Sequence, residues 1–146
     1  MNKLMVGSIA IAMFLLAGCG AAGEGPPEPG PIISVEAIVG NWQRTSGGIR
    51  YLQFREDGTT HSSRSLEAVI EGHGQTQWKY RIEGTQLILE ETLRVCEENP
   101  TGIYEVHLLE NGNLQFVSVE DECASRVSFL AGRPDEGITR EYEPVP

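Results

Sequence analysis

The sequence predicts an all-β domain, an antiparallel barrel or sandwich, on three observations. Apolar and polar residues alternate with a period of two along most of the chain after residue 31, as in strands with one buried face. Eight to nine such runs follow one another at spacings of about 8 to 12 residues. Asp-Gly and Asn-Gly pairs, which favour tight turns, separate some of them. Strands adjacent in the sequence are therefore expected to pair in space.

The first 18 residues are predicted to form a signal peptide. Lys3 supplies a positive start, and residues 4–17 form an apolar run interrupted only by Gly7 and Ser8. This run is shorter than the about 20 residues that a membrane-spanning helix needs, and small residues of the kind found at cleavage sites follow it. The domain behind it is therefore expected in the cell envelope, outside the cytoplasm.

Residues 16–19, Leu-Ala-Gly-Cys, stand where that cleavage is expected and resemble the lipobox of bacterial lipoproteins. The resemblance implies that Cys19 carries a diacylglyceryl thioether, with acyl chains such as palmitate, which would attach the chain permanently to a membrane. Gly20 is not the Asp that resembles an inner-membrane retention signal, so the implied destination is the outer membrane, if the host has one. The alternative is a plain secretory signal in which Cys19 occurs by chance.

Residues 19–31 are predicted to be a linker, because they are rich in Gly and Pro and offer little to bury. Residues 32–146 then fit a single domain with neither a second linker nor an internal repeat. Removal of residues 1–18 deletes Lys3 and no acid, which leaves 10 Lys and Arg against 21 Asp and Glu. This acidic balance argues against nucleic acid and against anionic lipid surfaces, so the lipid is the expected membrane contact.

Two cysteines remain once Cys19 is acylated, and Cys96 and Cys123 are expected to form a disulfide in an oxidising compartment. A hairpin folded at Asn111-Gly112 brings residues near 100 opposite Cys123, so a short loop lets Cys96 reach it. The bridge would staple the barrel mouth. A reactive thiol or a metal pair is the alternative, and no C-x-x-C motif or nearby His supports it.

The domain is expected to begin with a short helical turn over residues 32–39, which Gly40 ends. The expected strands, in chain order, cover residues 41–45, 50–55, 59–65, 78–82, 86–95, 104–108, 114–117, 126–131 and 138–142. Residues 132–135 are expected to be a turn. Residues 72–75, Gly-His-Gly-Gln, are expected to be a loop, either a flexible lid or a plain surface connection.

Gly40-Asn41-Trp42, at the head of the first strand, resembles the Gly-x-Trp signature of lipocalins, in which the Trp ring plugs the closed end of an eight-stranded up-and-down barrel. The segments that extend the resemblance are Tyr51-Leu52-Gln53-Phe54, Asp57-Gly58-Thr59, Trp78-Lys79-Tyr80, Leu87, Gly112-Asn113-Leu114-Gln115-Phe116 and Asp121-Glu122-Cys123. Together they resemble the compact lipocalin-like domains of bacterial lipoproteins, over residues 38 to 142. The family pattern also has a late arginine that packs over the Trp, for which Arg126, Arg133 and Arg140 are candidates.

This resemblance implies a small apolar or amphipathic ligand, bound at the open end of the barrel against inward-facing side chains. The expected ligand-binding residues are Trp42, Leu52, Phe54, Trp78, Tyr80, Tyr104, Val106 and Phe116, with Tyr80 or Tyr104 orienting the ligand. The alternative is an envelope interaction protein whose barrel is filled by these same side chains and has no small-molecule ligand. A continuous apolar cavity of about 300 Å³ or more would favour the ligand.

The sequence carries no motif for catalysis, for a metal or for another cofactor. His61, His73 and His107 fall in different segments without an H-x-H or H-x-x-x-H pair, and the acidic runs lack the spacing of a calcium loop. We therefore expect neither an enzyme nor a metal or cofactor site, and the sequence does not identify a protein partner.

Overall fold

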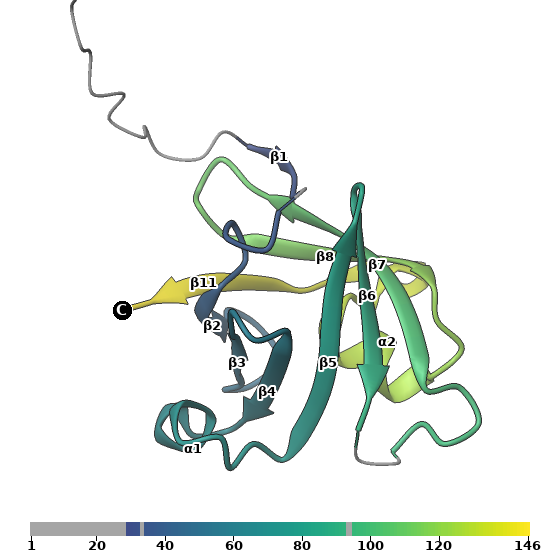
Figure 1. Cartoon of the computed structure of the whole chain (residues 1–146). Helices are drawn as coiled ribbons and strands as arrows, with labels where there is room; N and C mark the ends of the chain where they lie inside the picture. Colours follow the sequence, from purple (N-terminus) through teal and green to yellow (C-terminus); the bar gives the residue numbers. More distant parts are fainter. Residues whose placement is uncertain (1–28, 33, 93–94) are drawn as a thin grey trace, which may run out of the picture.

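The chain folds into a closed antiparallel barrel of eight strands with one further strand on its outside (Figure 1). This computed structural model describes residues 29–32, 34–92 and 95–146; the predicted signal peptide and Cys19 lie outside them. The barrel strands are β2 (Gly40–Arg44), β3 (Tyr51–Phe54), β4 (Thr59–Ser63), β5 (Thr76–Glu83), β6 (Gln86–Glu91), β7 (Thr101–Leu108), β8 (Leu114–Glu120) and β11 (Glu141–Val145).

Strands β2 to β8 pair antiparallel in sequence order, as the short turns predict. The last strand, β11, closes the barrel, because its residues 142–145 pair with 41–44 of β2 while Glu141 and Tyr142 pair with β8. The outer strand β1 (Gly30–Pro31) pairs with Leu108 and His107 at the end of β7. The prediction of an all-β, eight-stranded, up-and-down antiparallel barrel is confirmed, whereas the last two residues of the predicted linker belong to the fold.

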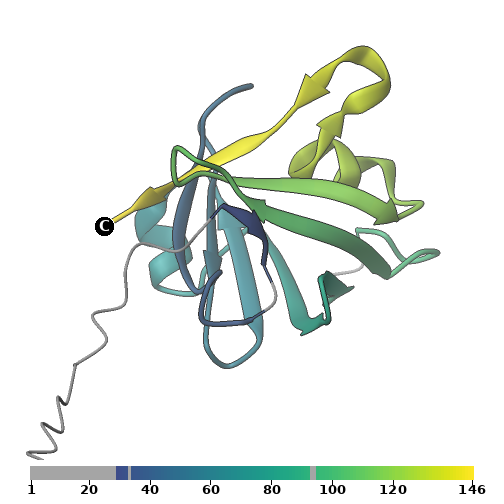
Figure 2. The ribbon, with the colours of Figure 1, turned by 90° about the horizontal axis from the view of Figure 1, so that it is seen from above.

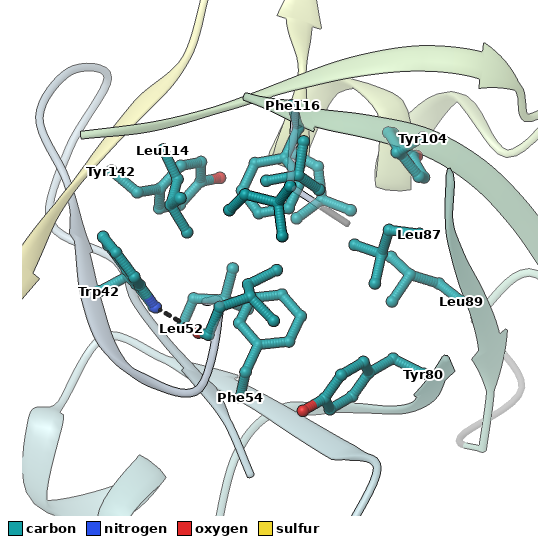
Figure 3. Packing of buried hydrophobic residues seen from close by; sticks show 14 of the residues in the cluster. Trp42, Leu52, Phe54, Tyr80, Leu87, Leu89, Tyr104, Leu114, Phe116 and Tyr142 are labelled. Carbon is teal, nitrogen blue, oxygen red and sulfur yellow. Dashed lines mark hydrogen bonds between the residues drawn. The ribbon is translucent and has the colours of Figure 1, made fainter. Parts of the chain in front are cut away.

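Alternation along the strands builds the core. In β7, Gly102, Tyr104, Val106 and Leu108 are buried, and the residues between them are partly exposed. Successive side chains of a strand point to opposite faces, so one set from each strand turns into the barrel. Figure 3 shows these side chains converging from strands around the whole wall.

The barrel has two unlike ends. At the closed end, short turns join β3 to β4, β5 to β6 and β7 to β8, and Val35 O accepts hydrogen bonds from the N–H groups of Ile38 and Val39 in the turn before β2. At the open end the connections are longer; they run through residues 45–50, 64–75, 92–100 and 121–140. In Figure 1, β1 lies at the top, with the closed end, and both α-helices lie in the lower half.

The predicted strand over residues 126–131 is wrong, because this segment forms the helix α2 (Ala124–Leu130). Arg126 and Leu130 are both buried and stand four residues apart, which places them on one helical face. After α2 come β9 (Gly132–Arg133), the 3-10 turn η1 (Pro134–Glu136) and β10 (Ile138–Thr139), and β9 pairs with β10. The apolar residues of this segment follow the period of a helix, whereas the prediction took the period of two of a strand.

The other differences concern the ends of elements. The short helix α1 (Leu66–Ile70) was not predicted; its N-cap Ser65 accepts a hydrogen bond from Ala68 N at 3.3 Å. Strand β6 ends at Glu91, four residues before the predicted end, and β11 lies later than the predicted run 138–142. In the part of the chain that the structure describes, no helix has the length and apolar character needed to span a membrane.

Candidate functional site

The barrel interior is filled with its own side chains (Figure 3). The rings of Phe54 and Phe116 stack with centroids 6.2 Å apart, and each meets a tyrosine edge-on, Tyr80 at 5.1 Å and Tyr142 at 5.2 Å. All eight residues predicted to bind a ligand belong to this core: Trp42, Leu52, Phe54, Trp78, Tyr80, Tyr104, Val106 and Phe116. The structure therefore gives these eight a packing role and does not bring them to an open surface.

The two tyrosines expected to orient a ligand already have partners. Tyr80 Oη donates to the carbonyl of Arg55 at 2.6 Å, and Tyr104 Oη donates to the carboxylate of Asp121. Burial raises the pKa of Tyr80 to about 12. Burial, reinforced by the hydrogen bond and negative charge of Asp121, also raises the pKa of Tyr104. Both hydroxyls therefore hold the fold together as neutral donors.

Trp42 lies at the closed end, as the lipocalin signature implies. Its indole Nε1 donates to the carbonyl of Ile38 at 2.9 Å, which ties β2 to the turn before it (Figure 3). The three arginines considered as partners for its ring make contacts elsewhere. Arg126 bonds Asp121, Arg133 bonds Glu136, and Arg140 bonds Ser46, all on connections of the open end.

A cavity of about 230 Å³ lies at the open end, between the barrel mouth and α2. Its lining includes Arg50, Ser62, Gln75, Trp78, Arg126 and Phe129. Of the eight predicted ligand-binding residues, Trp78 alone lines it. The cavity is smaller than the roughly 300–1,000 Å³ of typical small-molecule sites and mixes aromatic with polar walls. It is therefore not the continuous apolar pocket that was expected to favour a ligand inside the barrel.

Two aromatic rings form the apolar wall of the cavity. Trp78, on β5, and Phe129, on α2, have centroids 5.9 Å apart, and the guanidinium of Arg44 lies 5.8 Å from the centroid of the Phe129 ring. The Trp78 Nε1 is buried and has no hydrogen-bond partner among the described residues. An indole N–H normally finds a partner when buried, so this donor is unusual.

The polar wall includes the loop between β4 and β5 and the residue before β3, besides Glu91 and Arg126. Arg50 Nη1 donates to Gln75 Oε1 at 2.8 Å, and Gln75 N donates to the carbonyl of Ser62 at 2.7 Å. These bonds hold an amide and a guanidinium beside the two rings. The cavity can therefore take a small group that is apolar on one side and accepts hydrogen bonds on the other.

A disulfide and a buried ion pair fix α2 over the barrel mouth. Cys96 and Cys123 are bridged, as predicted, with Cα atoms 5.8 Å apart and 27 positions apart in the sequence. The loop-entropy model gives such a crosslink about 3.5 kcal/mol. Arg126, on the first turn of α2, donates from Nε and Nη2 to the two carboxylate oxygens of Asp121, at 2.6 and 2.7 Å. The cavity therefore has a rigid wall.

Backbone carbonyls around this buried ion pair accept further hydrogen bonds from Arg126. The side chains of Arg126 and Asp121 are 1% and 0% exposed. Arg126 also donates to the carbonyls of Asn99 and Pro100, at 3.1 and 3.0 Å. Burial lowers the pKa of Arg126, but the hydrogen bond and charge of Asp121 outweigh that effect and raise it. A Cβ on Gly102 would stand 2.7 Å from Arg126 Nε, which explains a glycine in the middle of a barrel wall.

The lining residues that the sequence did not single out include Phe129, Arg50 and Ser62, besides Gln75 in the stretch considered as a lid. The strand prediction for residues 126–131 did not identify Phe129 as a site residue, because only in the helix α2 does its ring lie beside Trp78 at the cavity. The described residues contain no group of three His, Cys, Asp or Glu side chains that could hold a metal ion. Comparison of the chain with models of known protein families, with curated proteins and with solved structures gives no match.

Proposed function

We propose that this protein is a lipocalin-like binding protein of the cell envelope, whose small amphipathic ligand occupies the cavity at the open end. The observation that carries the proposal is the cavity of about 230 Å³ between the barrel mouth and α2, with its two-sided lining. Burial of an apolar group against Trp78 and Phe129 would supply affinity, and a few polar groups would fix its orientation.

The same geometry limits the ligand. Because the barrel interior is packed, the apolar part of the ligand has to be short, or only its end enters the cavity. The guanidinium of Arg50 and the amide of Gln75 in the polar wall favour a ligand that carries an oxygen acceptor next to its apolar part. A small alcohol, acid or ester fits this description better than a hydrocarbon or a large polycyclic molecule.

The two tryptophans of the chain allow a direct test, because they mark opposite ends of the barrel. The variant Trp42→Phe keeps only the cavity indole, and the matched variant Trp78→Phe keeps only the closed-end indole. Titration with 1-hexanol as a neutral probe should shift or quench the emission of the first variant and leave the second unchanged. No response from Trp78, or an equal response from both variants, would refute ligand binding in this cavity.

We also propose that the domain is anchored through lipid on Cys19. The support is the resemblance of residues 16–19 to a lipobox, together with the place where the described domain starts: β1 pairs with the end of β7 at the closed end of the barrel (Figure 2). Incorporation of a palmitate analogue into the native chain, and its loss in Cys19→Ala, is the expected result. An unlabelled native chain in the soluble envelope fraction would show a plain secretory signal instead.

A second function is favoured by the filled barrel interior. A packed β-barrel can serve as a rigid scaffold that recognises a protein partner, and Val117 and Val119 on β8 are 43% and 50% exposed. Native mass spectrometry of the protein taken from its own envelope separates the two functions. A co-purifying small molecule supports the ligand, whereas a stoichiometric second polypeptide with an empty cavity supports the interaction protein.

A further inference from the structure

Four arginines gather at the open end, next to the cavity. A hollow of about 450 Å³ is lined by Arg44, Gly47, Gly48, Ile49, Arg50 and Arg64. Arg140 reaches the same loop, since its Nη1 donates to Ser46 Oγ at 3.4 Å and its guanidinium lies against Gly47. Arg50 lines both the hollow and the cavity, so the two spaces are neighbours.

These four cations have no carboxylate partners among the residues that the structure describes. Arg44 donates to the carbonyls of Gly47 and Gly48, and Arg50 donates to the neutral amide of Gln75. By contrast, Arg81 and Arg133, which lie elsewhere on the surface, each pair with glutamate. The concentration of unpaired positive charge is notable in a chain whose formal net charge is −10.

The arginines repel one another where they stand. Burial has the largest effect on Arg44 and lowers its pKa; Tyr142 raises it, and the charges of Arg140 and Arg50 each lower it by a smaller amount. The Nε of Arg140 is buried and has no hydrogen-bond partner in the described chain. An anion placed among these side chains would relieve the repulsion and accept the spare hydrogen bonds.

We propose that Arg44, Arg50, Arg64 and Arg140 form a subsite for an anionic group, a carboxylate or a phosphate. The inference rests on the proposed function, because the anion is the head group of the ligand whose apolar end enters the cavity. Arg50 joins the two parts, because Gln75 holds its guanidinium at the border between them. The protein thereby selects acids over neutral molecules of the same length, despite its acidic surface elsewhere.

The test compares 1-hexanol, hexanoate, hexyl phosphate and inorganic phosphate by calorimetry. The mature protein is used, in phosphatidylcholine nanodiscs if it carries lipid, with empty discs as the blank. An apolar cavity alone would prefer the alcohol, since the acids are better hydrated. The arginine subsite predicts the reverse, with at least one acid bound about 10-fold more tightly than hexanol and the difference shrinking as salt is added. Tight binding of inorganic phosphate, without binding of hexanoate or hexyl phosphate, would identify a free anion as the occupant of the subsite. The assignment of the anion to the head group of the ligand would then be wrong.

Single substitutions locate the effect. Arg64→Gln, whose side chain lines the hollow and not the cavity, should abolish most of the preference for the acid and leave hexanol binding and the melting temperature unchanged. Arg81→Gln is the matched control: it removes the same charge from a side chain paired with Glu83 and Glu90, and should keep the preference. Hexanol bound as tightly as both acids refutes the subsite alone. No binding of hexanol or of either acid refutes the proposed function as well.

Discussion

The two ends of the barrel are stabilised in different ways. At the closed end, Trp42 Nε1 reaches the carbonyl of Ile38, four positions away, hairpin turns of a few residues join the strands, and β1 pairs with the end of β7. At the open end, crosslinks join the long connections: the disulfide spans 27 positions, and the bond from Arg126 to the carbonyl of Asn99 also spans 27. The closed end therefore depends on short turns and strand pairing, and the open end on a covalent bond and a buried ion pair.

This difference explains where a binding site can form. Dense packing of the barrel interior leaves the closed end without adjustable space, because a close-packed core tolerates few voids. At the open end, the Arg126–Asp121 pair helps to hold α2 over the barrel mouth, and a cavity lies between α2 and the barrel. Buried polar groups without partners, such as Trp78 Nε1, also occur here.

The largest expected effect is loss of the buried ion pair at the open end. Asp121→Ala removes the carboxylate that bonds Arg126 directly, leaves the buried Arg126 only the longer contact of its Nη1 with Glu91 Oε2 at 3.8 Å, and removes the acceptor of the Tyr104 hydroxyl. Removal of one partner of a buried pair costs about 3–5 kcal/mol. Urea denaturation should show a loss of this size in the free energy of unfolding, and trapping by a protease should show that the open end unfolds first.

Arg133→Gln provides the control, because it breaks an ion pair on the same connection whose side chains are 52% and 49% exposed. An exposed pair contributes at most about 1 kcal/mol. Equal losses in Asp121→Ala and Arg133→Gln would show that the buried network does not hold α2 in place.

The sequence predicted the closed end well and, apart from the disulfide, the open end poorly, for the same physical reason. Period-two burial and turn residues such as Asn111-Gly112 are local signals, and they gave the barrel, its strand order and the disulfide. The helix α2 depends on a distant partner: Arg126 looks like a surface residue in sequence until Asp121 and the carbonyls of residues 99 and 100 surround it. The site residue Phe129 was missed because its position depends on that helix.

An intermediate effect on stability is expected when the same substitution, Trp to Phe, is made at each end of the barrel. Trp42→Phe and Trp78→Phe remove the same ring atoms, but Trp42 also loses the hydrogen bond to Ile38 O, whereas Trp78 Nε1 has no partner to lose. Loss of a buried hydrogen bond that leaves its acceptor unsatisfied costs about 1–3 kcal/mol. Trp42→Phe should therefore be the less stable variant by that amount in thermal and urea unfolding, and a less stable Trp78→Phe would contradict the comparison.

The smallest expected effect is a loss of folding stability at alkaline pH, to which one buried tyrosine at each end contributes. Burial raises the pKa of Tyr80, at the closed end, to about 12, and burial with the Asp121 contact raises that of Tyr104, at the open end. An unfolded tyrosine titrates near 10, so the folded state keeps a proton that the unfolded chain releases, and stability present below pH 10 is lost as the pH rises. Each tyrosine should cost less than about 1 kcal/mol at pH 10.5. Tyr80→Phe and Tyr104→Phe should each flatten the decline measured between pH 9 and 11, and an unchanged slope in both would show that these hydroxyls titrate as if exposed.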